Sequence, residues 1–163
     1  MKRISLFIVS MLLFLGVFAQ QPVKIYDPSA DAKAGVTAAL QLAKAEGKYV
    51  FLQIGGNWCP WCLRFNKLVH EDARLDSLLK VNYEVVKVNY SKENENRALL
   101  ATIDYPQRFG FPVFVILDGN GKRIHTQDSG LLEDGAGYSR EKVATMLTQW
   151  SADAIRKTIE KFK

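Results

Sequence analysis

Residues 49–62 of the chain read Tyr-Val-Phe-Leu-Gln-Ile-Gly-Gly-Asn-Trp-Cys-Pro-Trp-Cys. Large, strand-favouring side chains fill residues 49–54, and the Gly-Gly-Asn run that follows is typical of a strand end. Trp61, Phe65 and Leu68 then recur at helical spacing. The stretch therefore predicts a buried strand that turns directly into a helix. Both cysteines of the chain, Cys59 and Cys62, lie at that turn.

Strands and helices are also expected on both sides of this stretch. Apolar runs and alternating patterns predict further strands at residues 23–26, 83–90, 112–117 and 122–127. Helical patterns predict helices at residues 31–46, 72–79, 92–102 and from Ser139 toward Lys163, with a loop at residues 130–137. Asp118-Gly119-Asn120-Gly121 predicts a hairpin turn between the last two strands. This order predicts an α/β fold, with a mixed central sheet flanked by helices on both faces.

Length and composition restrict the kinds of protein to consider. The chain has 163 residues, of which 48% are hydrophobic and 24% charged, so one ordinary domain is expected and wholesale disorder is excluded. Two cysteines are too few for a disulfide scaffold. The net charge of +5 is mild and its basic residues are scattered, so we expect no nucleic-acid partner.

The first 19 residues have the pattern of a secretory signal. Lys2 and Arg3 precede an apolar run from Ile4 to Phe18, and the small residue Ala19 follows. We expect cleavage after Ala19, which divides the chain into a signal peptide at 1–19 and one domain at 20–163. The alternative is an uncleaved anchor, but the apolar run is short against the roughly 20 residues of a membrane span. We expect an exported protein that leaves the membrane after cleavage.

The spacing of the two cysteines suits thiol chemistry. Two intervening residues at a helix start place both sulfurs on one side of the first turn. Unpaired N–H groups and the helix dipole favour a thiolate at Cys59, and Pro60 suits the first helical position. Cys62 is expected one turn in and more buried. A Cys59 thiolate could then attack a disulfide, and Cys62 could resolve the mixed disulfide.

Two other interpretations of the cysteine pair are open. A purely structural disulfide would close a very small loop and constrain the unfolded chain little. A structural zinc site needs four ligands, and the remaining soft ligands are His70, on the same expected helix as the cysteines, and His125, on a distant expected strand. We expect neither a metal nor another cofactor.

A second segment of the sequence supports the same interpretation of the cysteine pair. Residues 110–121 read Gly-Phe-Pro-Val-Phe-Val-Ile-Leu-Asp-Gly-Asn-Gly. This segment and the Trp-Cys-x-x-Cys motif after a hydrophobic strand together resemble the thioredoxin superfamily, most closely its exported bacterial members. The likeness runs from Val23 to the last helix and implies that residues 20–163 form a thioredoxin-like domain.

The resemblance also implies roles for individual residues. It makes Cys59 the nucleophile, Cys62 the resolving cysteine and Pro112 a cis-proline facing them. The main chain of Phe111 would pair with a bound substrate strand. Phe111, Trp58, Trp61 and Pro60 are expected to form an apolar rim around the sulfurs, the alternative being that some of these aromatic side chains belong to the core. With Pro112 they are the expected substrate-binding residues.

The chain departs from the family pattern at three places. Pro60-Trp61 stands where thioredoxins have Gly-Pro, and Trp61 replaces the histidine of the strong periplasmic oxidant. Gln53 stands where thioredoxins bury an aspartate that helps deprotonate the resolving thiol. Glutamine cannot accept a proton at neutral pH, so we expect slower exchange than in thioredoxin. Phe111 is bulkier than the usual residue before the cis-proline.

These features predict a monomeric, periplasmic thiol–disulfide oxidoreductase, more reductase or isomerase than strong oxidant. Its partners would be protein or peptide disulfides and a separate redox protein. Two rivals are a peptide-binding module or redox sensor without turnover, and a structural envelope subunit locked by a disulfide.

Overall fold

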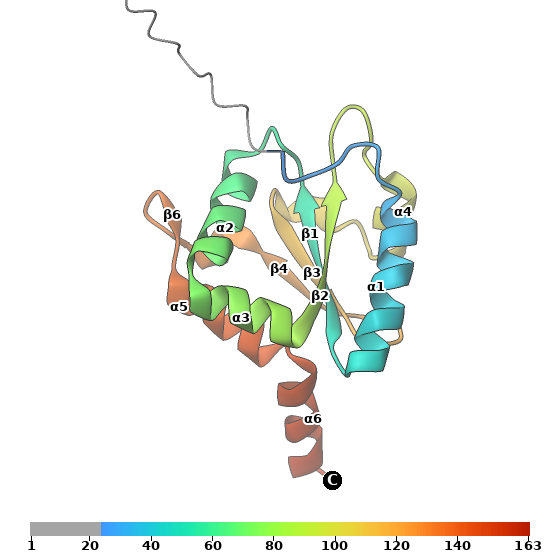
Figure 1. Cartoon of the computed structure of the whole chain (residues 1–163), viewed down its shortest axis with the longest axis vertical. Helices are drawn as coiled ribbons and strands as arrows, with labels where there is room; N and C mark the ends of the chain where they lie inside the picture. The colour runs from blue at the N-terminus through green and yellow to red at the C-terminus, as the bar shows by residue number, and fades with distance from the viewer. Residues whose placement is uncertain (1–23) are drawn as a thin grey trace, which may run out of the picture.

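The computed structural model describes residues 24–163, so the predicted signal peptide lies outside the described residues. A four-stranded sheet runs through the middle of the domain, with helices on both faces (Figure 1). Its strands are β1 (Tyr49–Gly55), β2 (Tyr83–Asn89), β3 (Val113–Leu117) and β4 (Arg123–Asp128), in the spatial order β2-β1-β3-β4. β1 pairs in parallel with β2 and antiparallel with β3, and β3 pairs antiparallel with β4. The predicted mixed α/β fold is therefore confirmed.

The remaining elements surround this sheet. The main helices are α1 (Ala32–Glu46), α2 (Pro60–Glu71), α3 (Ala73–Asn82), α4 (Arg97–Thr102), α5 (Arg140–Gln149) and α6 (Ala152–Lys161). Two short 3₁₀ helices, η1 (Pro106–Phe109) and η2 (Ser129–Leu132), and a small hairpin of β5 (Glu133–Asp134) and β6 (Gly137–Tyr138) complete the described chain. No helix in residues 24–163 combines the length and apolar character that crossing a membrane requires.

Side chains of β1 alternate between two hydrophobic cores. Val50, Leu52 and Ile54 pack into the core beneath α1 and α4. Phe51 points the other way, into the core beneath α2, α3 and α5. Because β1 lies inside the sheet and is covered on both faces, its residues are apolar on both faces apart from Gln53.

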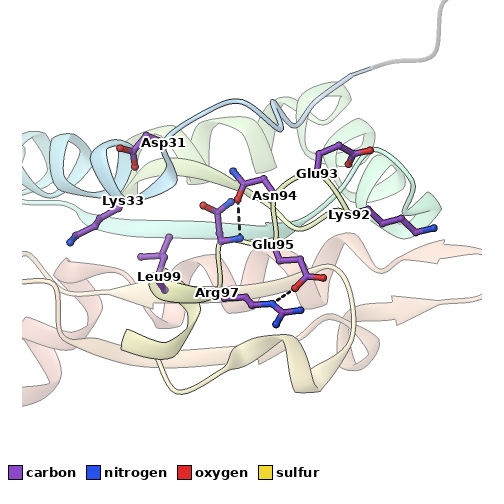
Figure 2. A pocket seen from close by; sticks show the side chains of 10 residues that line it. Asp31, Lys33, Lys92, Glu93, Asn94, Glu95, Arg97 and Leu99 are labelled. Carbon is purple, nitrogen blue, oxygen red and sulfur yellow. Dashed lines mark hydrogen bonds and ion pairs between the residues drawn. The ribbon is translucent and has the colours of Figure 1, made fainter.

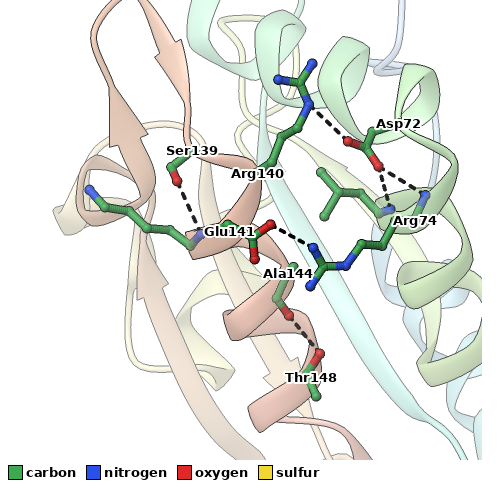
Figure 3. Close-up of polar contacts among 9 residues, drawn as sticks. Asp72, Arg74, Ser139, Arg140, Glu141, Ala144 and Thr148 are labelled. Atoms are coloured by element: carbon green, nitrogen blue, oxygen red, sulfur yellow. Dashed lines mark hydrogen bonds and ion pairs between the residues drawn. The ribbon is translucent and has the colours of Figure 1, made fainter.

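Polar contacts join two helices on the α2 face (Figure 3). Asp72 accepts hydrogen bonds from the Arg74 and Leu75 N–H groups, which caps α3. The same carboxylate pairs with Arg140 at 3.0 Å, and Arg74 pairs with Glu141 at 2.7 Å. These exposed ion pairs align α3 with α5 but contribute little stability each.

The predicted strand at 23–26 is wrong for its described residues, because Lys24 to Tyr26 are not in a strand. Instead, the Ile25 and Tyr26 N–H groups donate to Oδ1 of Asn57 at 2.8 and 3.0 Å. The Asn57 side chain thus satisfies main-chain groups that would otherwise need a neighbouring strand.

Three helix or loop predictions also need correction. The helix predicted at 92–102 begins only at Arg97, since Asn94 and Asn96 tie the preceding residues into a loop. The last helix is broken in two, because Ser151 accepts from Ala154 N–H and starts α6. The loop expected at 130–137 contains most of η2 and the β5–β6 hairpin.

Candidate functional site

The cysteine pair lies where β1 passes into α2, as predicted. Cys59 is the N-cap residue of α2, Pro60 is its first residue, and the Cys62 N–H donates to Cys59 Sγ at 3.1 Å. The two cysteines form a disulfide whose Cα atoms are 5.3 Å apart. The N-terminal end of α2 therefore directs a backbone N–H group and the positive end of the helix dipole at the Cys59 sulfur.

Burial distinguishes the two sulfurs. Cys59 is 3% exposed, whereas Cys62 is 0% exposed. Cys62 packs onto Gly55, where an added β-carbon would stand under 3.0 Å from its sulfur. Both cysteines are therefore buried, and only Cys59 keeps any solvent-exposed surface.

A segment far upstream closes the site from one side. The Asn57 Nδ2 group donates to the Tyr26 carbonyl at 2.7 Å, in addition to the two bonds that its Oδ1 accepts. This three-bond clamp inserts Tyr26, which is only 2% exposed, into one apolar cluster with both cysteines. The Tyr26 hydroxyl also lies against Gly55, under 3.0 Å from where a β-carbon would stand.

The Phe111–Pro112 peptide bond is cis, which agrees with the expectation drawn from the resemblance. Pro112 is buried, and Phe111 is half-buried and packs against the cluster of Tyr26, Cys59 and Cys62. The Phe111 ring also meets Trp58 edge-on, with centroids 5.4 Å apart. The sequence-predicted residues of the 110–121 segment are thus brought beside the cysteines.

The aromatic side chains of the predicted rim are not equally accessible. Trp58 is 56% exposed, and its Nε1 donates to the Tyr90 carbonyl at 2.7 Å. Pro60 is exposed as well. Trp61 is half-buried, because its ring packs edge-on against Tyr138. Trp58 and Pro60 are therefore the exposed members of the predicted rim, whereas Trp61 packs against both the cysteine cluster and Tyr138.

Gln53 is buried on the α2 face of β1, where the resemblance places an aspartate in thioredoxins. Nε2 of Gln53 has no hydrogen-bond partner among the described residues. Across the ladder from Gln53 is Lys87, and burial lowers the pKa of this lysine. Its ammonium donates to Asn66 Oδ1 at 2.6 Å. A cavity of about 480 Å³ borders Gln53, Asn66 and Lys87.

Sequence reasoning did not identify Tyr26, Asn57 and Lys87 as parts of this region. Asn57 was interpreted only as the end of a strand, although its position two residues before Cys59 was a local signal. No local pattern marks Tyr26, because it reaches the site through a contact across 31 residues.

Another cavity, of about 640 Å³, lies away from the cysteines (Figure 2). Charged and polar side chains from the start of α1 and the loop before α4 line it, including Asp31, Lys33 and Arg97. No residue of the cysteine motif borders it. Among residues 24–163, no group of three or more His, Cys, Asp or Glu side chains could hold a metal ion.

Several solved protein structures are similar to this one. A disulphide isomerase from Xylella fastidiosa Temecula1 is similar, with 27% identity and a TM-score of 0.69 over 78% of this chain and 96% of that one. The C-terminal domain of Neisseria meningitidis DsbD, in its oxidised form, has 18% identity and a TM-score of 0.55, over 74% of this chain and 96% of that one. A thioredoxin from Thermus thermophilus has 24% identity and a TM-score of 0.52, over 69% and 81%.

The last two likenesses show the fold alone. No curated protein matches the sequence significantly. The model of one family, described as thioredoxin-like, matches residues 31–119, which is more than half of the chain and includes the cysteine pair and the cis-proline. With its central mixed sheet and its Cys59–Cys62 disulfide at the start of α2, the chain belongs to the thioredoxin-like family.

Proposed function

We propose that the protein is an exported thiol–disulfide oxidoreductase that exchanges its Cys59–Cys62 pair with disulfides in other proteins. One observation carries this proposal: a Cys59–Cys62 disulfide caps α2, with the outer sulfur at the helix N-terminus and the inner sulfur fully buried. A purely structural disulfide has no need of this asymmetry, whereas a nucleophile and a resolving thiol do.

The reaction takes place in two exchanges. The Cys59 thiolate attacks one sulfur of a substrate disulfide, and a bond between Cys59 and that sulfur forms as the substrate bond breaks. The second substrate sulfur leaves with the electron pair and takes a proton. The Cys62 thiolate then attacks Cys59 Sγ, restores the intramolecular disulfide and releases the first substrate sulfur as a thiolate. Two electrons pass to the substrate, and a partner redox protein returns them.

Extended protein segments are the substrates that fit the surface next to Cys59. Trp58 and Pro60 offer exposed apolar contacts, and no main-chain hydrogen bond involves Phe111 within the described residues. An extended peptide could therefore pair with the Phe111 main chain and place its disulfide over Cys59.

Reduction or isomerisation fits the site better than strong oxidation. Trp61 carries no full charge that would stabilise a Cys59 thiolate. The similarity to a disulphide isomerase points the same way. A redox titration against glutathione tests this direction. A reduction potential near thioredoxin's, about −270 mV, supports a reductase, and one near −120 mV would identify an oxidant instead.

The insulin reduction assay with dithiothreitol tests the activity itself. We expect the protein to accelerate insulin reduction and Cys59→Ser to lower the rate to that of dithiothreitol alone. The matched variant Cys62→Ser keeps the nucleophile, so it should stop turnover but accumulate a mixed disulfide with a peptide. If the unaltered protein fails to accelerate insulin reduction while Cys59→Ser keeps the affinity for peptides, the proposal is wrong and a peptide-binding module is favoured.

Export is proposed from the N-terminal pattern of Lys2, Arg3 and the apolar run that ends at Ala19. We propose that residues 20–163 are the mature domain and that it works in the periplasm as a monomer. N-terminal sequencing of protein taken from the periplasmic fraction should begin at Gln20. Recovery of a chain that begins at Met1, in the membrane fraction, would show an uncleaved anchor.

A further inference from the structure

Two buried polar groups at and beside strand β1 lack a hydrogen-bond partner among the described residues. The Tyr26 hydroxyl and Nε2 of Gln53 are both buried and have no hydrogen-bond partner among residues 24–163. Each such group costs folding free energy, so it calls for a physical explanation. Phenylalanine and leucine would fill the same space without that cost.

The surrounding residues hold Tyr26 firmly in this place. The Asn57 side chain binds the Tyr26 main chain on both its N–H and its carbonyl group. Gly55 lacks the β-carbon that would collide with both the Tyr26 hydroxyl and the Cys62 sulfur. The hydroxyl and the sulfur thus share the space that a side chain at position 55 would otherwise occupy.

The hydroxyl is in the state needed to donate a hydrogen bond. Burial raises the pKa of Tyr26 far above its ordinary value, so the hydroxyl keeps its proton at any physiological pH. The nearby Gln53 side chain opposes this rise in pKa only in part. The Tyr26 proton is therefore free to point at another acceptor.

The sulfur of Cys62 becomes such an acceptor only when the disulfide opens. A bonded or protonated sulfur accepts hydrogen bonds weakly, whereas hydrogen bonds to an ionised group are about twice as strong as neutral ones. In the oxidised protein the hydroxyl consequently lacks a good partner, and opening the disulfide supplies one.

We propose that Tyr26 donates a hydrogen bond to the Cys62 thiolate and so assists the resolving step of thiol–disulfide exchange. The proposal rests on the function proposed above and names the group that compensates for the missing aspartate at position 53. Cys62 gives its proton to water, and Tyr26 keeps its own proton throughout. The Cys62–Cys59 bond forms, the bond between Cys59 and the outside sulfur breaks, and the departing thiolate takes up a proton from water.

Several other titratable groups lie near the cluster of Tyr26, Cys59 and Cys62, so the test must separate their effects from that of Tyr26. They are Cys59 at the start of α2, Tyr138 on β6, and Lys87, across the ladder from Gln53. Tyr138 provides a matched control for Tyr26. It is buried, its hydroxyl has no hydrogen-bond partner among the described residues, and its ring packs on Trp61 and Phe65.

The test measures the resolving step alone. A mixed disulfide between Cys59 and thionitrobenzoate is formed at low pH, and stopped-flow absorbance follows thionitrobenzoate release by Cys62 as the pH is raised. We expect Tyr26→Phe to slow release about tenfold at neutral pH and to move the midpoint of the rate–pH profile upward by about one unit. Tyr138→Phe should leave the profile unchanged.

Two further measurements separate this role from a structural one. Oxidised Tyr26→Phe should unfold at the same urea concentration as the unaltered protein or a higher one, because the lost hydroxyl had no partner. In the Cys62→Ser background, Tyr26→Phe should leave the alkylation rate of Cys59 unchanged. Overlapping rate–pH profiles for Tyr26→Phe and the unaltered protein would overturn the proposal. Equal shifts in Tyr26→Phe and Tyr138→Phe would also overturn it, since they would indicate a general change in packing.

The result of the thionitrobenzoate test does not depend on whether the proposed function is correct. Thionitrobenzoate release is intramolecular and proceeds even if the protein fails to reduce insulin. A protein inactive on insulin that still shows the Tyr26→Phe shift would retain this inference and lose the proposed function.

Discussion

A β-carbon at position 55 would stand under 3.0 Å from both Cys62 Sγ and the Tyr26 hydroxyl. Along the α2 face of β1, the side chains shrink from Phe51 through Gln53 to no side chain at Gly55. This taper leaves room for a sulfur and a hydroxyl at the end of the strand. At the residue scale, a glycine is therefore required here by close packing, since its φ angle is an ordinary one.

Replacing this glycine should disturb the site more than the fold elsewhere. We expect Gly55→Ala to lower the free energy of unfolding of the oxidised protein by about 1–3 kcal/mol, because the added methyl group overpacks a closed site. Urea unfolding monitored by tryptophan fluorescence measures this change. Gly137→Ala is the control, because its β-carbon would meet no atom within 4 Å and its cost should stay within about 0.5 kcal/mol. Equal midpoints for both variants would contradict the packing argument.

At the scale of elements, one aromatic stack ties the edge strand β4 to the end of α5. The His125 ring lies on the Trp150 ring, with centroids 4.0 Å apart and planes 10° apart. Burial lowers the pKa of His125, and the contact of its Nε2 with Gln127 at 3.1 Å opposes this only in part. The fold therefore favours the neutral imidazole between β4 and α5.

This preference predicts a loss of stability in mild acid. As the pH falls below about 6.5, the unfolded chain takes a proton on His125 before the folded chain does, so unfolding becomes more favourable. Above that pH neither state is protonated and the effect vanishes. We expect the melting temperature of His125→Phe, which keeps a flat ring on Trp150, to fall less between pH 7 and pH 5 than that of the unaltered protein. The other histidine, His70, whose Nδ1 lies 3.5 Å from Asp76, is present in both proteins and so cancels from this comparison. An unchanged slope in His125→Phe would refute the effect.

Elements with local start and stop signals were predicted to within a residue or two. Asp31 caps α1 and Gly47 ends it in the left-handed conformation, as their residue types indicate. α4 was predicted to begin five residues too early, because the side chains of Asn94 and Asn96 bond to groups distant in sequence. A helical pattern of apolar residues does not reveal that side chains bind main-chain groups and hold them outside the helix.

At the scale of the whole molecule, the strand order β2-β1-β3-β4 decides which segments meet at the cysteines. β1 lies between β2 and β3, so its end is next to the end of β2 and the start of β3. The cis-proline segment thereby reaches the cysteine pair, and Tyr90 and Phe111 come to pack with ring centroids 4.8 Å apart. The aromatic surface around Cys59 is assembled from parts that are about 20 to 50 residues apart in the chain.

The sequence by itself determined the mixed α/β architecture, the position of the cysteine pair at a strand-to-helix turn, and the segment around Pro112. These features depend on local signals, namely hydrophobic period, glycine and proline positions, and the spacing of two thiols. Only the tertiary structure decided that Lys24 to Tyr26 form no strand, that Trp61 turns toward Tyr138, and that the Tyr26 hydroxyl lies beneath Cys62. Each of these depends on contacts between segments distant in sequence, whose free energies are set by packing and by hydrogen bonds that no local pattern encodes.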